Sequence, residues 1–205
     1  MVNPYEERIG SLRDPDKEYR ATFRFLVVLA AIVLIFYILF TQIFIGVQVV
    51  GASMQPTLHD GDYLFVDTTA SIERGDIVVL SAQVHGQAAD EDGYSWIIKR
   101  VVGLPGDSIR AEGGVLYRKE AGEAEYTAVD EPYLGEEWTR YAYIAPVTVG
   151  EGEIYVMGDN RNNSQDSREL GPQPVEHVVG VVTGWSLAAK DALSGIFGLF
   201  ARNTA

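Results

Sequence analysis

Residues 25–47 read FLVVLAAIVLIFYILFTQIFIGV, and these 23 positions carry no charged side chain. As a helix they would extend about 35 Å at 1.5 Å per residue, which is enough to cross a hydrocarbon core of ~30 Å. A buried helix of a soluble protein is the alternative, but the 16 residues from Phe25 to Phe40 contain no strongly polar side chain. The sequence therefore predicts a transmembrane helix over 25–47.

Basic residues indicate the orientation of this helix. Those that precede it are Arg8, Arg13, Lys17, Arg20 and Arg24, and the next basic residue is Arg74. The positive-inside rule then places residues 1–24 in the cytoplasm as an N-terminal tail and residues 48–205 outside. A cleaved secretory signal is the alternative, but its apolar region would run for about 7–15 residues and end in small residues. We therefore expect an uncleaved signal-anchor that crosses the membrane once.

Composition excludes several classes of protein. Apolar residues make up 47% and charged residues 22% of the 205 positions, which is unlike a disordered chain. The net charge of −13 argues against a general nucleic-acid binder. The absence of cysteine excludes disulfide scaffolds, thiolate zinc sites and thiol proteases. The three histidines, His59, His85 and His177, are too few for a histidine-rich metal site.

Beyond the apolar segment, the sequence predicts a mainly β, mostly antiparallel domain over 48–184. Short stretches rich in β-branched and aromatic residues alternate there with turns rich in Gly, Asp and Pro. The expected strands are Tyr63–Val66, Asp76–Leu80, Trp96–Val102, Ile154–Met157 and Val178–Val182.

Two further regions differ in composition. Residues 111–153 hold ten acidic and three basic side chains, with alternating fragments at 115–118 and 141–144. We interpret them as an inserted, solvated β subdomain rather than a site. Residues 185–205 form a C-terminal tail whose apolar stretch is too short and too charged to span a bilayer. That stretch is either a helix on the membrane surface or a helix packed against the domain.

Lys99 is the first candidate catalytic residue. On a strand, Ile97, Lys99 and Val101 point to one face, so the lysine has apolar neighbours on its own side. Burial there would favour the neutral amine and would provide a general base without histidine. The alternative is an exposed lysine with its ammonium in water, and the segment alone favours that alternative.

Ser53 is a candidate nucleophile close to the membrane segment. Gly51 permits close backbone approach, and Pro56 stiffens the following turn, which suits a serine presented beside backbone N–H groups. A turn or a helix cap is the alternative role for this serine. A nucleophilic serine needs a base. His59 lies in a polar turn and is a weaker candidate than Lys99, and His177 has no evident partner.

A third segment, residues 158–168, is dense in Asp, Asn, Ser and Arg directly after an apolar strand. Asp–Arg pairs here could buttress a site, and a polar loop held by its own hydrogen bonds is the alternative. The spacing does not fit an EF-hand calcium loop, which needs a glutamate at its twelfth position.

Four blocks, taken together and in order, closely resemble bacterial type I signal peptidases, the membrane-anchored Ser–Lys proteases. The blocks are Ser53-Met54-x-Pro56-Thr57-Leu58, Gly75-Asp76-Ile77-Val78-Val79, the run Lys99–Asp107 (KRVVGLPGD) and the run Gly158–Arg168 (GDNRNNSQDSR). The resemblance covers roughly residues 22–184.

The resemblance implies a role for each site residue. Ser53 would be the nucleophile, Lys99 its general base, and Ser164 would help to orient the lysine amine. Met54 would line the substrate cleft. Ion pairs and hydrogen bonds of four further residues would support the site, namely Asp159, Arg161, Asp166 and Arg168. The substrates would be exported preproteins with small residues before the cut, often Ala-x-Ala.

The resemblance also implies the setting of the enzyme. It would use no metal or cofactor and would work at the outer face of a bacterial plasma membrane. Its partners would be preproteins and membrane lipid, with the secretion machinery as a further candidate and no nucleic acid. A second reading of the same sequence is a catalytically silent relative that binds exported proteins or another partner.

Two positions depart from the pattern of the family. Asn162 stands where aspartate is common, which puts any charge role there in doubt. Gly51 stands where some members have a serine whose hydroxyl assists the oxyanion hole, so the hole would rest mainly on backbone donors such as the Ser53 N–H. A self-cleaving Ser–Lys repressor is a third reading, but such proteins carry a DNA-binding domain where this chain has its apolar segment.

Overall fold

The computed structural model describes residues 15–81 and 96–201. Much of the tail predicted at 1–24, and His85, lie outside the described residues. The chain divides into two compact units, one ending at Ile43 and the other beginning at Phe44.

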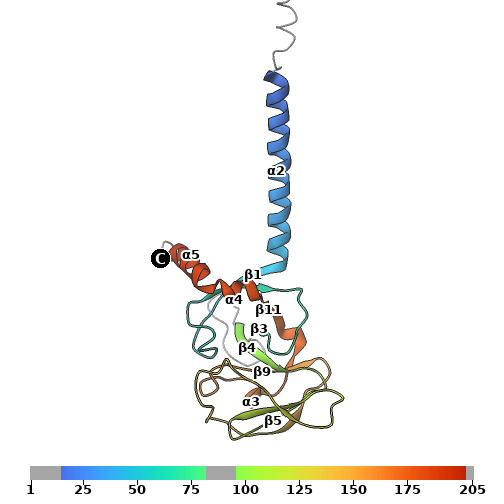
Figure 1. Cartoon of the computed structure of the whole chain (residues 1–205), viewed down its shortest axis with the longest axis vertical. Helices are drawn as coiled ribbons and strands as arrows, with labels where there is room; N and C mark the ends of the chain where they lie inside the picture. Colours follow the sequence, from blue (N-terminus) through green and yellow to red (C-terminus); the bar gives the residue numbers. More distant parts are fainter. Residues whose placement is uncertain (1–14, 82–95, 202–205) are drawn as a thin grey trace, which may run out of the picture. The chain divides into compact units, whose positions relative to one another are not determined.

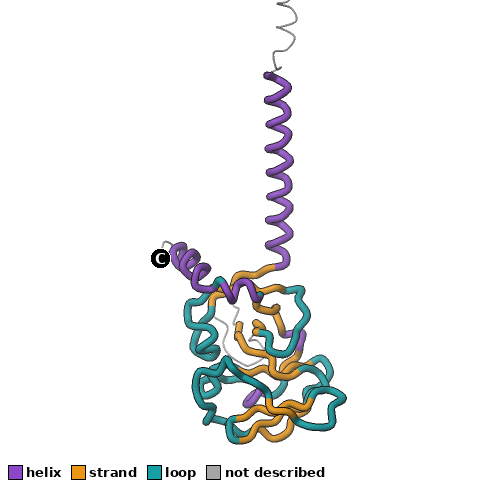
Figure 2. The backbone as a smooth tube through the Cα atoms, viewed as in Figure 1, coloured by secondary structure: helices purple, strands orange, loops and turns teal. Residues whose placement is uncertain are grey.

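In its described residues, the first unit is one long helix, α2 (Pro15–Ile43; Figures 1 and 2). Its segment Tyr19–Ile43 has a mean hydropathy of 2.8 over its most apolar window, and its 25 residues would reach about 38 Å. Within the described part of the chain, it is the one helix long and apolar enough to cross a bilayer. Its apolar side chains are exposed, as expected for a helix that faces lipid.

The helix ends four residues before the predicted limit at Val47. Strand β1 (Phe44–Gln48) follows at once and pairs antiparallel with β2 (Tyr63–Asp67). The physical reason is that apolar residues serve a buried strand as well as a lipid-facing helix. Val47 is buried in the core of the second unit.

The second unit is mainly β, as predicted, and every strand pair in it is antiparallel. Its larger sheet has seven strands in the order β1-β2-β11-β3-β4-β9-β10, and its smaller sheet has four in the order β7-β6-β5-β8. The remaining strands of the larger sheet are β3 (Ile77–Ser81), β4 (Trp96–Gly103), β9 (Glu153–Met157), β10 (Gln173–Pro174) and β11 (Val178–Val182). All five predicted strands are therefore present, with ends that differ by a residue or so.

The smaller sheet lies within residues 108–148. Its strands are β5 (Ser108–Glu112), β6 (Val115–Lys119), β7 (Thr127–Ala128) and β8 (Ile144–Thr148). The alternating fragment predicted at 141–144 is not a strand. Tyr141 has a φ of +53°, and β8 begins only at Ile144. Buried residues of this sheet form one cluster with Tyr155 and Met157 of β9, so the two sheets share apolar packing.

Short helices complete the unit. They are α3 (Ser167–Leu170), the 3-10 turn η2 (Val175–His177), α4 (Gly184–Ala188) and α5 (Lys190–Ala201). The single C-terminal helix expected from sequence is therefore two helices. Phe197 of α5 stacks on Tyr63 of β2 with ring centroids 4.1 Å apart, and Ser194 accepts a hydrogen bond from the Tyr63 N–H. Trp185 of α4 stacks on Phe65 but stays about half exposed.

Candidate active site

The turn that carries Ser53 begins directly after β1 and is held at both ends. The Gly51 N–H donates to the Asp60 carboxylate over 2.8 Å, and the Leu58 N–H donates to the Met54 carbonyl over 2.9 Å. Met54 and Leu58 are fully buried in the core below the turn. Burial of these two side chains fixes the backbone, so the half-buried Ser53 between Gly51 and Met54 has a defined position.

Gly51 has a structural reason to be glycine. Its φ is +89°, a conformation that residues with a side chain rarely adopt. A serine at this position would therefore strain the turn.

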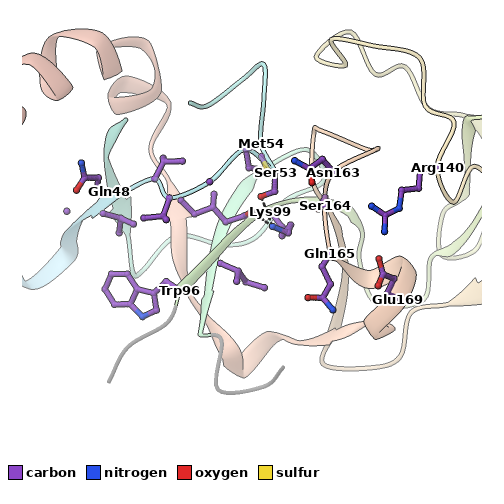
Figure 3. Close-up of a pocket in the computed structure, with 17 residues that line it drawn as sticks. Gln48, Ser53, Met54, Trp96, Lys99, Arg140, Asn163, Ser164, Gln165 and Glu169 are labelled. Carbon is purple, nitrogen blue, oxygen red and sulfur yellow. Dashed lines mark hydrogen bonds between the residues drawn. The ribbon is translucent and has the colours of Figure 1, made fainter. Parts of the chain in front are cut away.

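Lys99 lies on β4 opposite Val78 and is only 4% exposed, so the alternative of a solvated lysine is wrong. Its Nζ is 2.9 Å from the Ser53 Oγ and donates to the Ile98 carbonyl over 3.0 Å (Figure 3). Burial lowers the pKa of Lys99 to about 8, while the nearby Asp166 carboxylate and Arg168 guanidinium act on it in opposite directions. The lysine is therefore a base poised near neutral pH, in contact with a hydroxyl.

Ser164, Asp166 and Arg168 form a hydrogen-bonded group beside the lysine. The Ser164 hydroxyl donates to Asp166 over 2.8 Å, and Arg168 donates to the same carboxylate through Nε and Nη2, each over 2.8 Å. Burial by itself would raise the pKa of Asp166, but the bonds from Arg168, from the Gly158 N–H and from Ser164 outweigh it and hold the pKa below its usual range. Asp166 is therefore a fixed negative charge.

Asp159 is paired with a residue that the sequence reasoning missed. Arg100 donates to it through Nε over 2.8 Å and Nη2 over 2.7 Å, and the Thr57 hydroxyl also donates to it. Strand alternation placed Arg100 on the opposite face from Lys99, but no sequence signal named its partner. Through Thr57, this ion pair joins β4 to the turn that carries Ser53.

Arg161 is 2% exposed and pairs with Glu131, which the sequence reasoning also missed. Glu131 belongs to the acidic region interpreted as solvated, yet its side chain is only 6% exposed. The guanidinium of Arg161 also donates to the Gly158 carbonyl and lies over the Trp138 ring. That region therefore contributes a buried carboxylate to the support of the site, which the acidic composition concealed.

Gly158 lies where these groups converge. A Cβ at this position would lie 2.3 Å from the Ser164 Oγ and 2.5 Å from the Ser53 carbonyl oxygen. The Asn160 N–H, two residues on, donates to that same carbonyl over 3.0 Å. Glycine at 158 thus lets the segment Gly158–Arg168 pack directly against the Ser53 turn.

The two described histidines are not part of this arrangement. His59 is exposed in its turn, and His177 lies 3.9 Å from Glu176 on the 3-10 turn. Within residues 15–81 and 96–201, no group of three or more His, Asp or Glu side chains is arranged to hold a metal ion.

A cavity of about 1220 Å³ surrounds Ser53 and Lys99. Its lining comes from three segments and two single residues, namely Gly46–Gly51 with Ser53 and Met54, Trp96–Lys99, Asn163–Gln165, and Arg140 and Glu169 (Figure 3). The first two segments are mostly apolar and the others are polar. A serine beside a buried lysine at the centre of such a cleft is an arrangement suited to the chemistry of a serine hydrolase.

The chain belongs to the signal peptidase family, peptidase S26, whose model matches residues 22–185. The signal peptidase I of Bacillus licheniformis is 38% identical over 143 residues, covering 63% of this chain and 69% of that protein. That of Streptococcus pneumoniae is 34% identical over 173 residues, covering 66% and 78%. A crystal structure of a signal peptidase I from Enterococcus faecalis is 26% identical with a TM-score of 0.43, covering 56% of this chain and 98% of that one.

Family membership confirms the predicted class of enzyme. The protein is a bacterial type I signal peptidase by family, a serine protease that acts in signal-peptide processing. Its N-terminal apolar helix fits a membrane-anchored protein.

Proposed function

We propose that this chain removes signal peptides from exported preproteins with Ser53 as nucleophile and neutral Lys99 as general base. One observation carries the proposal. The Nζ of a lysine that is 4% exposed lies 2.9 Å from the Ser53 Oγ, and its pKa is lowered to about 8. A neutral amine at that distance can accept the hydroxyl proton as the reaction begins.

The steps follow from this contact. Lys99 takes the proton from Ser53 as the Oγ bonds the scissile carbonyl carbon, and backbone donors such as the Ser53 N–H stabilise the oxyanion. The lysine ammonium then protonates the leaving nitrogen as the C–N bond breaks, which leaves the signal peptide as an ester on Ser53. A water molecule gives a proton to the amine and attacks the ester. The Lys99 ammonium then returns that proton to the Ser53 oxygen as the ester C–O bond breaks, which releases the signal peptide with a carboxyl end.

The surrounding residues hold this geometry. The Ser164 hydroxyl donates a hydrogen bond to Asp166. The hydroxyl oxygen of Ser164 can therefore accept a hydrogen bond from the Lys99 amine and orient that amine. Asp166 with Arg168, Asp159 with Arg100, and Arg161 with Glu131 form the buried support. Positioning groups of this kind keep a nucleophile and its base within reacting distance.

The apolar end of the cleft suits small residues before the cut. In an extended substrate, the first and third residues before the cut point to the same side. Val47, Met54 and Ile98 line this end, and their apolar side chains suit apolar residues such as the alanines of an Ala-x-Ala site. Among the described residues, β9 pairs with β4 from Arg100 onward, and the substrate backbone would pair with β4 at Ile97 and Ile98.

Chain connectivity supports placement at the outer membrane surface. Five residues separate Val47 from Ser53, so the nucleophile follows the apolar segment closely. We propose residues 1–24 as a cytoplasmic tail, the single span as the anchor, and 48–184 as the extracytoplasmic protease domain. A shared tether would raise the effective concentration of the scissile bond of a membrane-bound preprotein. The half-exposed Trp185 and Ile196 make 185–205 a candidate lipid contact, and the secretion machinery would deliver the substrate.

The test is cleavage of an Ala-x-Ala preprotein in detergent micelles by wild type, Ser53→Ala and Lys99→Ala. We expect wild type to cut after the second alanine and each variant to lose about 10⁴-fold or more in kcat/KM. Ser71→Ala is the matched control, because Ser71 is exposed and lies outside the cleft lining. Substantial cleavage by either dyad variant would refute the mechanism. Failure of folded wild type to cut would favour the binding-only relative.

A further inference from the structure

The cleft has two chemically different ends, one on each side of Ser53 and Lys99 (Figure 3). One end is lined by Gly46–Val50 and Trp96–Ile98, which are mostly apolar. The other end is lined by Arg140, Asn163–Gln165 and Glu169, which are polar or charged. An extended peptide that passes Ser53 must therefore meet both.

The chain itself indicates which end receives which part of the substrate. Gly46 is three residues from Ile43, the end of the apolar helix, and so lies within about 11 Å of it. The apolar core of a signal peptide precedes its cut and would lie in the bilayer. On the proposed function, residues before the cut enter by the Gly46–Val50 end, and residues after the cut leave past Arg140.

Arg140 is held at its end of the cleft by Asn162. The Asn162 Oδ1 accepts from the N–H groups of Thr139 and Arg140, each over 2.9 Å. Its Nδ2 donates to the Glu136 carboxylate over 2.9 Å and to the Glu137 carbonyl over 2.8 Å. The side-chain amide of Asn162 therefore fixes the loop of residues 136–140 with these four hydrogen bonds. An aspartate could not donate the last two bonds and would set a second carboxylate beside Glu136.

The guanidinium of Arg140 is exposed on the cleft side of this loop (Figure 3). Its Nη1 makes a long contact of 3.5 Å to the Asn162 carbonyl, and its Cζ lies 5.1 Å from the centroid of the Tyr141 ring. Arg168, by contrast, has its charge matched by Asp166. A guanidinium carries five donors in a fork that fits a carboxylate, so Arg140 can bind one from a passing peptide.

We propose that Arg140 is a specificity-determining residue that favours an acidic side chain among the first residues after the cut, and that Asn162 is the positioning residue that holds it there. This rests on the proposed function. Glu169 at the same end has the opposite charge, so the preference depends on which of the first residues carries the substrate charge. The exposed setting makes the preference modest, about threefold to fivefold.

The test uses preproteins that are identical up to the cut and carry Asp, Ser or Lys at one of the second to fifth positions after it. The readout is the ratio of kcat/KM for the Asp substrate to that for the Lys substrate. At one position, we expect wild type to give a ratio of about 3–5, Arg140→Gln about 1, and Arg140→Glu a ratio below 1. Lys119→Glu makes the same charge change outside the cleft lining and should keep the wild-type ratio.

Asn162 is tested in the same assay. Asn162→Asp should lower the ratio towards 1 although Arg140 is still present, whereas a merely structural role would change rates on the three substrates equally. Equal ratios in wild type and Arg140→Gln at every position would overturn the proposal. If wild type cuts none of the substrates, the proposed function fails. In that case, the binding affinities of labelled Asp and Lys preproteins for the Ser53→Ala variant test Arg140 without turnover. Tighter binding of the Asp preprotein would support the role of Arg140, and equal binding would contradict it.

Discussion

Two buried cations of this protein, Arg161 and Lys99, have opposite surroundings. Arg161, 2% exposed, has the Glu131 carboxylate against it as an ion-pair partner. Lys99, 4% exposed, makes its hydrogen bonds to a hydroxyl and a carbonyl, both neutral. A buried cation with a carboxylate partner is a structural support, whereas one with neutral partners gives up its proton readily. Burial of a cation therefore does not by itself indicate a catalytic role. The distinguishing feature is whether its hydrogen-bond partners are charged or neutral.

The largest expected effect comes from removing the partner of Arg161. Glu131→Gln leaves a buried guanidinium that cannot lose its proton, so we expect the free energy of unfolding to fall by about 3–5 kcal/mol. Urea denaturation at pH 7 measures this, with Glu123→Gln, an exposed carboxylate of the same region, as the matched control near zero. A loss below about 1 kcal/mol would mean that the buried Arg161 does not require a charged partner, and the contrast with Lys99 would fail.

A smaller effect of the opposite sign is expected at Lys99. The folded state holds the pKa of Lys99 near 8 instead of 10.5, which at pH 7 costs about 3 kcal/mol. Lys99→Met removes that cost, so the variant should be inactive and yet at least as stable as wild type at pH 7.

The pH dependence of this difference provides the control. Between pH 8 and 10.5 the unfolded lysine binds more protons than the folded one, so the stability of wild type rises with pH relative to Lys99→Met. The advantage of the variant should therefore shrink across that window and stay constant below it. A difference that does not change from pH 7 to 10.5 would contradict a lowered pKa.

The smallest effect concerns the rate. Because the neutral amine is the base, kcat/KM should rise about tenfold per pH unit below pH 8 and level off above it. The pH dependence of kcat/KM on a neutral preprotein measures this acid limb. Arg140→Gln is the comparison variant, and its profile should have the same midpoint pH. An acid limb that falls only below about pH 5 would indicate a base other than lysine.

The sequence predicted what depends on local pattern. Strand alternation identified the face on which Lys99 lies, and the turn residues around Ser53 marked a rigid loop. Glu131 and Arg100 were missed because their partners come from segments 30 and 59 residues away, and no local pattern encodes a register between them. The end of the helix at Ile43 was missed because an apolar run satisfies lipid and core equally well. The predicted borders of the domains and the roles of the supporting side chains stay predictions.

The lowered pKa of Lys99 also gives this site a chemical signature. An amine that is largely neutral near pH 8 reacts as an electron-pair donor, so small electrophiles such as cyanate or short aldehydes should modify it at a pH where ordinary lysines resist. Lys190, whose pKa is raised by its contacts with Asp191 and Asp62, should be among the last to react. Carbamoylation of Lys99 would remove the base and add a known mass to that residue. The mass shift on Lys99 should therefore increase in step with the loss of turnover.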